Sequence, residues 1–350
     1  MTEPLTLSID AMGGDNAPNM VVEGIEASLS HLSEMKFLLY GDEAKLAPLL
    51  ESHPRAAAVA EIRHTDEAIS NDQKASSALR AGRNSSMRLA IDAVKSGEAA
   101  GVISAGNTGA LMAMAKFVLK TLPGIDRPAI ATYYPTQRGD SVMLDLGANV
   151  DCDADNLVQF AVMGEVFARN VLGLENPTIG ILNVGAENLK GNEAVREAAA
   201  ALQETPLPIK FHGFVEGDDI GAGTVDVVVT DGFTGNIALK TAEGTAKLFG
   251  NFLKQALSQS LMSKMGALLA GSALKKFKMK VDPRRYNGAM FLGLNGICIK
   301  SHGGTDALGF ANAIHVAEEL ITHSFNDRIK EDYAQLSGNA PTQEKAADSE

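Results

Sequence analysis

The stretch Asp226–Thr241 holds the densest group of residues that could do chemistry. Three consecutive valines predict a buried strand at its start, and an apolar pattern with helical spacing follows the loop. The glycines let the backbone turn and approach a ligand. Thr234 or Asn236 can cap the helix, which leaves its first N–H groups free for an anion. These features predict a phosphate or oxyanion site, and a plain strand-to-helix turn with Asp231 as its cap is the alternative. The candidates are Asp231, Gly232, Thr234, Gly235, Asn236 and Lys240.

A second loop repeats part of this chemistry. A short apolar strand over 100–104 precedes it, and an apolar helix over 111–119 follows it. Its Gly-x-Thr-Gly core matches that of the first loop, so we expect the two loops to be two walls of one anion site. Small residues can also serve helix–sheet packing alone, but Asn and Thr add donors that packing does not need. The candidates here are Ser104, Gly106, Asn107, Thr108 and Gly109.

Four further strand ends carry polar residues. At the end of a parallel strand such residues face the crevice where ligands bind in open α/β sheets. In each case a local turn bond, a surface lysine or a turn-capping histidine is the alternative. The candidates are Asp10, Gly13, Gly14 and Asp15 after the first strand, Asp145 and Asn149 after the strand near 142–144, Lys190 before the helix over 193–203, and His302 after the last strand region.

Two segments are locally basic in an acidic chain. Residues 68–88 are rich in Ser, Asn, Arg and Lys, which predicts a face for phosphate or an acidic partner, or else a solvated loop and helix face. Residues 244–281 contain seven lysines and no acidic residue, and their apolar residues predict one or two amphipathic helices with a break near Gly266 or Gly271. Such helices favour an anionic membrane surface or an acidic partner. A dimer helix with solvated lysines is the alternative.

Composition narrows the classes of function. The chain has 350 residues, 45% of them hydrophobic, and a net charge of −12, which is typical of a large globular protein and argues against a general nucleic-acid binder. Cys152 and Cys298 are isolated, so we expect a reducing compartment and no metal cluster. Asp151, Asp153 and Asp155 lack the glycine and glutamate of a calcium loop, and their charges should raise the pKa of the Cys152 thiol.

Five loop sequences in order carry a resemblance to a known family. They are Asp10-Ala11-Met12-Gly13-Gly14-Asp15, Ser104-Ala105-Gly106-Asn107-Thr108-Gly109-Ala110, Leu144-Asp145-Leu146-Gly147-Ala148-Asn149, Asp231-Gly232-Phe233-Thr234-Gly235-Asn236 and Lys300-Ser301-His302-Gly303. Over about residues 5–330 the chain resembles the bacterial phosphate:acyl-acyl-carrier-protein acyltransferase family, PlsX. Ala186 and Asn188 depart from it, because the family often has a more acidic run before Lys190.

The resemblance implies an α/β fold, a parallel sheet in two lobes around a cleft. That fold is similar to isocitrate and isopropylmalate dehydrogenases and to phosphotransacetylase. It implies one catalytic unit over 1–335, with a helical protrusion at about 244–281, and we expect the tail 336–350 to be disordered. It also implies transfer of a fatty acyl group from acyl carrier protein to inorganic phosphate, for phosphatidic acid synthesis, without a cofactor or metal. The implied protein is a cytoplasmic homodimer in peripheral contact with an anionic membrane and with the downstream glycerol-phosphate acyltransferase.

The residues suit that reaction. Phosphate is itself a nucleophile, so no serine or cysteine nucleophile is needed. The amides of the two Gly-x-Thr-Gly loops, with Lys190 or Lys240, could hold phosphate and stabilise charge on the carbonyl oxygen. Asp231 could take the remaining proton, and we assign Lys190, Asp231 and His302 as the catalytic candidates. A dehydrogenase of the same fold using NAD and a metal, and a non-enzymatic membrane scaffold organised around 244–281, are the competing hypotheses.

Overall fold

A computed structural model describes residues 5–30, 35–207 and 209–336. The expected disordered tail lies outside the described residues except for Leu336. The strands are β1 (Leu5–Asp10), β2 (Met35–Gly41), β3 (Ala60–His64), β4 (Gly101–Ser104), β5 (Ala129–Pro135), β6 (Asp140–Leu144), β7 (Thr178–Leu182), β8 (Lys210–Val215), β9 (Val227–Val229), β10 (Ala289–Leu292) and β11 (Ile297–Lys300).

Helices follow most of these strands. They are α1 (Asn19–Ser28), α2 (Glu43–Ser52), α3 (Pro54–Ala57), α4 (Ala75–Ala81), α5 (Ser86–Ser96), α6 (Thr108–Leu119), α7 (Ala154–Val171), α8 (Glu193–Glu204), α9 (Gly217–Ala222), α10 (Gly232–Ser258), α11 (Leu261–Leu269), α12 (Gly271–Lys280), α13 (Ala307–Thr322) and α14 (Phe325–Leu336). Helices α13 and α14 are separate, because the chain turns at His323 and Ser324.

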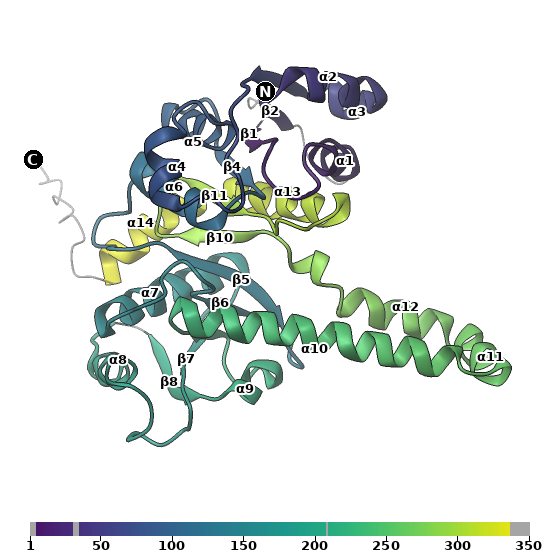
Figure 1. The fold of residues 1–350 in the computed structure, drawn as a ribbon. Helices are drawn as coiled ribbons and strands as arrows, with labels where there is room; N and C mark the ends of the chain where they lie inside the picture. Colours follow the sequence, from purple (N-terminus) through teal and green to yellow (C-terminus); the bar gives the residue numbers. More distant parts are fainter. Residues whose placement is uncertain (1–4, 31–34, 208, 337–350) are drawn as a thin grey trace, which may run out of the picture.

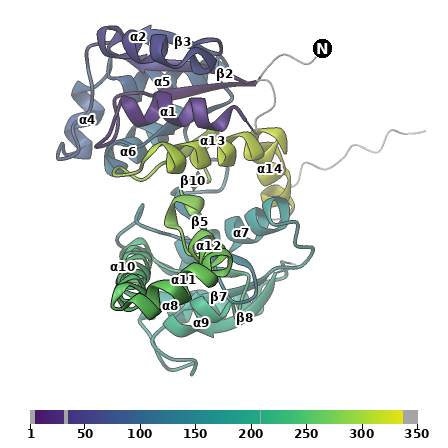
Figure 2. The ribbon, with the colours of Figure 1, turned by 90° about the vertical axis from the view of Figure 1, so that its right-hand side faces the viewer.

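One mixed sheet runs through the whole molecule in the order β3-β2-β1-β4-β11-β10-β5-β6-β9-β7-β8. The expectation of a parallel sheet is therefore only partly right. The pairs β11–β10, β10–β5 and β5–β6 are antiparallel, and the other pairs are parallel. Because of these three reversals, the parallel strands of the second lobe run in the direction opposite to those of the first lobe. The second-lobe strands are β6, β9, β7 and β8. Figures 1 and 2 show the two lobes above and below β10 and β5.

The interior strands are buried on both faces. Leu7, Ser8 and Ile9 in β1 are all fully buried, because helices cover each face of the sheet. The buried hydroxyl of Ser8 avoids an unpaired polar group by donating to the carbonyl of Ala90 at 2.7 Å. In the second lobe, α7 buries Phe160 and Phe167 against the sheet. This continuous core fixes the strand ends that carry the candidate site residues.

The basic segment forms a long protrusion. Helix α10 begins at Gly232, within the first candidate loop, and runs unbroken to Ser258, where the chain turns through α11 and returns along α12 (Figure 1). The breaks fall at Gln259–Ser260 and at Ala270, so the predicted break near Gly271 is confirmed, while Gly266 lies inside α11. The segment is three helices, because Ser260 caps α11 through a hydrogen bond from the Ser263 N–H at 3.0 Å.

Candidate functional site

The carboxylate of Asp10 is the centre of a polar cluster at the end of β1. It is 2% exposed and accepts hydrogen bonds from the hydroxyls of Ser86 at 2.6 Å and Ser104 at 2.7 Å. Burial raises the pKa of this carboxyl, and the two hydroxyl donors act against that rise. Ser104 also accepts from the Gly106 N–H at 3.0 Å, so its oxygen is fully used inside the protein. Asp10 and Ser104 therefore position the loop before α6.

Lys300 brings a cation to this cluster. It ends β11, which pairs in parallel with β4, so Lys300 lies opposite Ser104. Its ammonium donates to the carbonyls of Ala105 and Ser301. Burial lowers the pKa of Lys300 to about 8, although the nearby carboxylates of Asp10 and Asp15 raise it. A lysine in this state can bind an oxyanion and titrates close to neutrality. We call Asp10, Ser86, Ser104, Lys300 and His302 the Asp10 cluster.

His302 lies in an exposed loop directly after Lys300. Its backbone N–H donates to the side-chain oxygen of Asn287 at 2.8 Å, and its Nδ1 accepts from the Gly304 N–H at 3.1 Å. The partial burial of its ring lowers the pKa of His302, and the charges of Lys300 and Lys240 lower it as well. The ring is therefore neutral at pH 7. Because Nδ1 accepts, the proton lies on Nε2, which makes that atom a hydrogen-bond donor.

The N-terminus of α6 lies beside the same cluster. Asn107 caps the helix through a hydrogen bond from the Ala110 N–H at 3.0 Å. Its amide group donates to the carbonyls of Asn71 and Gln73, both at 2.9 Å, so Asn107 fixes the loop and is not free for a ligand. Within the described ranges, the N–H groups of Thr108 and Gly109 have no acceptor, as expected in a first helical turn. They form an anion-binding helix end.

The glycines before α1 and α6 allow two loops to pack closely. A Cβ on Gly13 would lie 2.7 Å from the backbone nitrogen of Gly106, and Gly14 has a φ of +108°, which side chains rarely adopt. Asp15 follows, with one carboxylate oxygen accepting from the Asn71 amide at 2.8 Å. These glycines serve the contact between the two loops. Gly109 differs, because a Cβ there would make only ordinary van der Waals contacts, 3.5 Å from the Asn107 Oδ1 and 3.6 Å from the Ala75 Cβ.

A second buried aspartate organises the end of β6. Asp145 is 0% exposed and accepts from the backbone N–H groups of Ile130, Ala148 and Asn149 and from the Asn149 side chain. Burial raises the pKa of its carboxyl, and these hydrogen bonds oppose the rise. Asn149 is also bound to the Pro128 carbonyl at 2.8 Å. With Asp231 and Gly232 we call these residues the Asp145 cluster, in which the polar groups bind one another.

Asp231 is the cap of α10. The alternative of a strand-to-helix turn capped by Asp231 is therefore confirmed. Its two carboxylate oxygens accept from the Thr234 N–H at 2.8 Å and from the Thr234 hydroxyl at 2.7 Å. Thr234 and Asn236 are not the caps expected from the sequence, because the aspartate reaches the N–H groups first. The Gly232 N–H donates to the Asn149 carbonyl at 2.7 Å. Most of the expected anion donors of this helix end are thus already paired.

Gly235 and Asn236 complete this packing. A Cβ on Gly235 would overlap the Asp145 carbonyl, and Asn236 lies 3.6 Å from the Cβ position of Gly147. The glycines here serve contact between α10 and the loop after β6. Since β9 runs opposite to β4, the two Gly-x-Thr-Gly loops follow strands that end at opposite edges of the sheet. The expectation that they are two walls of one anion site stays a prediction, since Lys240, further along α10, acts on Lys300 beside the second loop.

Lys190 lies on an exposed loop between β7 and α8. Its backbone carbonyl accepts from the Asn183 amide at 3.2 Å, which holds the loop. Among the described residues its ammonium has no ion-pair partner. Because β7 and β9 are parallel neighbours, this loop follows the same edge of the sheet as Asp231. The Lys190 loop therefore follows a strand that neighbours the one before Asp231, and the contribution of Lys190 to the site stays a prediction.

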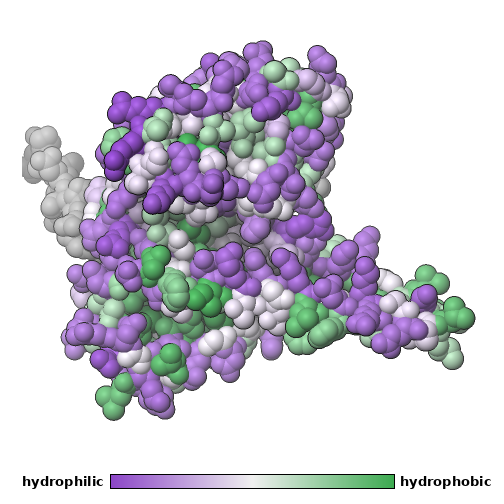
Figure 3. Space-filling model, viewed as in Figure 1, coloured by the Kyte–Doolittle hydropathy of each residue, from purple (hydrophilic) through white to green (hydrophobic). Residues whose placement is uncertain are grey.

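The middle of α10 connects the two regions. Lys240 is exposed on this helix, two turns after the cap, and its charge acts on both Lys300 and His302. Glu243 and Lys247, further along α10, also act on His302. Figure 3 shows this face hollowed where the first lobe meets α10. The wall that faces the Asp10 cluster is therefore the side of α10 and not its N-terminus.

Lys300 and Ser86 are functional candidates that the sequence reasoning missed. Lys300 is part of a motif quoted for the resemblance, and a lysine at the end of an apolar strand is the signal that could have found it. Ser86 lies in the polar stretch 68–88, where nothing in the local pattern separates it from its neighbours. The pKa of the Cys152 thiol is raised to about 12 as predicted, but burial and the charges of Asp145 and Asp231 raise it, and not the neighbouring aspartates named in the sequence.

A group of side chains with metal-ligand chemistry lies elsewhere, at Asp42, His64 and Asp66. His64 Nδ1 accepts from the Glu43 N–H at 3.2 Å, and its Nε2 lies 3.4 Å from the Asp66 carboxylate. Asp42 accepts from the Ala44 N–H at 3.0 Å as the cap of α2. These contacts explain the group as part of a turn.

Comparison with known proteins gives the family. A family model described as "Fatty acid synthesis protein" matches residues 5–328. A phosphate acyltransferase of Rhodospirillum centenum is 63% identical over 336 residues, which cover 96% of this chain and 95% of the relative. One from Paramagnetospirillum magneticum is 62% identical and covers 96% of both chains. This chain belongs to the phosphate acyltransferase family. It is an acyltransferase.

Solved structures support the fold. A phosphotransacetylase from Streptococcus pyogenes matches with a TM-score of 0.62 at 18% identity, covering 92% of this chain and 95% of that one. The EutD phosphotransacetylase from Staphylococcus aureus matches with a TM-score of 0.58 at 16% identity, covering 91% and 94%. A putative 4-hydroxythreonine-4-phosphate dehydrogenase from Salmonella typhimurium matches at 0.52 and 14% identity, covering 91% and 99%. The predicted phosphotransacetylase-like fold of the acyltransferase is confirmed.

Proposed function

We propose that this acyltransferase moves a fatty acyl group from the thioester of acyl carrier protein to inorganic phosphate. A phosphate oxygen attacks the thioester carbonyl, the C–S bond breaks, and the carrier thiolate leaves. The acyl-phosphate product feeds phosphatidic acid and phospholipid synthesis. The thiolate needs little acid assistance, since a thiol has a pKa of about 8.5. The observation that carries the proposal is the half-buried ammonium of Lys300 beside a helix end with unpaired N–H groups.

Phosphate binding is assigned to the Asp10 cluster. The Lys300 ammonium and the Thr108 and Gly109 N–H groups converge on the loop that Ser104 and Asp10 hold in place. A cation and oriented amides at low solvent exposure stabilise an oxyanion without reorganising during the reaction. Lys240, on the facing helix, adds positive charge at the entrance. These groups hold the nucleophile against the carbonyl.

His302 is assigned to the carbonyl oxygen. Its neutral ring donates from Nε2, because Nδ1 is held by the Gly304 N–H. A neutral donor stabilises the negative charge that develops on the thioester oxygen and does not have to lose a proton. Asp15, which is exposed beside Gly304, is the carboxylate placed to take the phosphate proton. Asp231 is less suited to that role, because both of its oxygens are bound by Thr234.

Lys190 remains a proposed contributor from the second lobe. As an exposed lysine without an ion-pair partner among the described residues, it raises the local concentration of anionic substrate. Lys190→Ala should reduce turnover about tenfold, within the range of electrostatic steering, and leave the melting temperature unchanged. Turnover equal to wild type would remove the second lobe's loop from the mechanism.

The test of the function is loss of acyl-carrier-protein thioester by the purified protein, with and without inorganic phosphate. Phosphate-dependent loss and a hydroxylamine-reactive product are expected. A folded protein that leaves the thioester intact at every phosphate concentration would overturn the proposal. A nicotinamide titration then tests the competing dehydrogenase hypothesis through cofactor absorbance.

A homodimer is proposed from the exposed apolar side of α10. Leu248, Phe249 and Phe252 are at least half exposed along this helix. Apolar stripes of this size on a helix are typical of an interface. Sedimentation equilibrium should give twice the chain mass, and Phe249→Glu with Phe252→Glu should give monomer. A monomeric wild-type protein at micromolar concentration would refute this.

Membrane contact is proposed for the end of the protrusion. Helix α11 exposes Leu261, Met262, Leu268 and Leu269, with Leu269 at 86%, and Figure 3 shows a hydrophobic tip beside hydrophilic residues at the end of the protrusion. None of the helices in the described part of the chain is long and apolar enough to span a membrane. An apolar tip with basic neighbours suits peripheral binding to anionic lipid. Leu268→Glu with Leu269→Glu should abolish sedimentation with anionic vesicles.

A location of the acyltransferase in the cytoplasm, and contact with the downstream glycerol-phosphate acyltransferase, complete the proposal. An acyl-phosphate is reactive toward water, so transfer at the membrane surface would shorten its exposure. Fluorescence of a tagged chain should lie at the cell membrane, and the Leu268→Glu, Leu269→Glu variant should spread through the cytoplasm. Diffuse signal from both proteins would contradict peripheral contact.

A further inference from the structure

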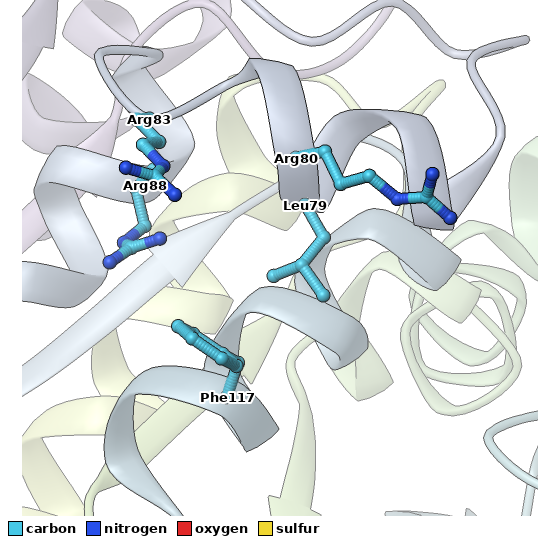
Figure 4. Close-up of a pocket in the computed structure, with 5 residues that line it drawn as sticks. All are labelled: Leu79, Arg80, Arg83, Arg88 and Phe117. Atoms are coloured by element: carbon cyan, nitrogen blue, oxygen red, sulfur yellow. The ribbon is translucent and has the colours of Figure 1, made fainter.

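A basic groove with an apolar floor lies on the first lobe, away from the Asp10 cluster. It has a volume of about 480 Å³ and is lined by Leu79, Arg80, Arg83, Arg88 and Phe117. Figure 4 shows Arg83 and Arg88 together on one side, Phe117 across from Arg88, Leu79 between them, and Arg80 extending to the other side. Three guanidinium groups around two apolar side chains are unusual on a chain with a net charge of −12.

Two of the three arginine charges of this groove have no ion-pair partner among the described residues. Arg88 pairs with Asp92 at 3.0 Å and lies 5.8 Å from the Phe117 ring centroid. Arg80 and Arg83 are exposed and form no ion pair with any described residue. Phe117 is 54% exposed, with the Lys120 ammonium 4.9 Å from its ring. An exposed aromatic side chain ringed by arginines has the composition of a binding hot spot, and a partner would bury it.

Two helices join the groove to the proposed phosphate site. Phe117 is on α6, whose N-terminal N–H groups belong to that site, and Leu79 and Arg80 are on α4, which packs against α6. The segment before α4 is tied to the cap of α6 through the Gln73 carbonyl, which accepts from Asn107 at 2.9 Å. Nine residues of helix separate Thr108 from Phe117, or about 14 Å along the axis. A partner seated in the groove could therefore reach the site with a flexible arm of that length.

We propose that this groove docks the acidic face of the carrier protein that delivers the acyl thioester. The identity of the partner rests on the proposed function. The docking position rests on the positive charge of the groove and on its closeness to the proposed phosphate site. Carboxylates of the partner pair with Arg80 and Arg83, and an apolar side chain of the partner packs against Leu79 and Phe117. Guanidinium–carboxylate pairs fix the orientation of the partner and speed its association.

The test combines binding and turnover. Fluorescence anisotropy measures the dissociation constant of labelled carrier protein without an acyl chain and without phosphate, so binding is read apart from catalysis. Arg80→Glu with Arg83→Glu should raise this dissociation constant at least tenfold. The matched control, Lys36→Glu with Lys210→Glu, changes the net charge equally at two exposed lysines elsewhere and should change it less than twofold. Phe117→Ser should weaken binding with all charges kept.

Turnover separates the failure of this proposal from failure of the proposed function. In Arg80→Glu with Arg83→Glu, the KM for the carrier thioester should rise by the same factor as the dissociation constant, with kcat and the KM for phosphate unchanged. Wild-type turnover with unchanged carrier binding in this variant overturns the docking site and leaves the function. Groove-dependent binding without wild-type turnover supports the docking site and overturns the function. Loss of anionic-vesicle binding alone in the variant would make the groove a lipid contact and overturn the proposal.

Discussion

The Asp10 and Asp145 clusters start from the same feature, a buried aspartate at the end of an interior strand, and differ in what surrounds it. Asp145 is bound by its own loop and by Asn149, so its donors leave no group free for a ligand. Asp10 is bound by two hydroxyls and lies beside a lysine whose ammonium borders an open helix end. The comparison teaches that a buried carboxylate alone does not mark a site. We expect a ligand site where a cation also lies beside helix N–H groups that have no acceptor in the protein.

Removing the cation should have the largest effect. Lys300→Met should lower kcat/KM for phosphate at least about 100-fold, the size seen when one oxyanion donor is lost. The melting temperature should not fall, because burial of the ammonium already disfavours its charge. Phosphate-dependent thioester loss and thermal unfolding measure the two effects. Turnover within a factor of three of wild type would show that the Asp10 cluster does not hold phosphate.

A change in the Asp145 cluster should lower the stability of the fold more than it lowers turnover. In Asp145→Asn an amide group faces N–H donors that lose their acceptor, and each unsatisfied buried donor costs about 1–3 kcal/mol. We expect the free energy of unfolding to fall by about 2 kcal/mol on that basis, with kcat of the folded protein within a factor of three. Urea unfolding checks the first value. An unchanged stability with lost turnover would reverse the roles of the two clusters.

The pH dependence should follow Lys300. Its pKa of about 8 means that the cation is present below pH 8, and that the KM for phosphate rises about tenfold per pH unit above it. Lys300→Arg keeps its positive charge above pH 8, so its KM for phosphate should not show this rise. In the unfolded chain the lysine keeps its proton to about pH 10.4. The unfolded state therefore binds more protons between these pKa values, and this group makes the free energy of unfolding rise with pH there.

The smallest effect is expected at the cap of α10. Asp231→Ala removes the acceptor of the Thr234 N–H and should cost about 1 kcal/mol of stability. Turnover should stay within a factor of three, since the cap lies outside the Asp10 cluster. Asp231→Ser, which can still cap, is the control and should recover most of the stability. A 100-fold loss of turnover in both variants would return Asp231 to the role of general base.

Local patterns identified most strands and helices but not the strand directions. The strand expected over 100–104 and the helix expected over 193–203 follow from local patterns, and each is found within a residue of its expected place, as Gly101–Ser104 and Glu193–Glu204. The three antiparallel pairs around β10 depend on long-range pairing that no local signal specifies. For the same reason the matching Gly-x-Thr-Gly loops could be identified, while the opposite directions of the strands before them could not.

Site chemistry was predictable by residue type more than by role. Asp10, Thr108 and His302 were chosen because polar residues followed predicted strands, and the structure brings them to one region. Asn107, Asn149 and Asp231 were chosen by the same rule, yet their side chains bind neighbouring backbone. Whether a polar side chain is free depends on which loop packs against it, and that contact joins residues far apart in the chain. Lys300 was missed because its importance comes from burial.

The most direct test of the account is protection of the folded protein by inorganic phosphate. A ligand that binds only the folded state raises the melting temperature, and the rise grows with the logarithm of the ligand concentration relative to its dissociation constant. We predict that phosphate raises the melting temperature of the wild type and of Lys190→Ala, and that Lys300→Met loses this shift. Retention of the shift in Lys300→Met, with its loss in Lys190→Ala, would place the phosphate at the edge of the second lobe and contradict the central claim.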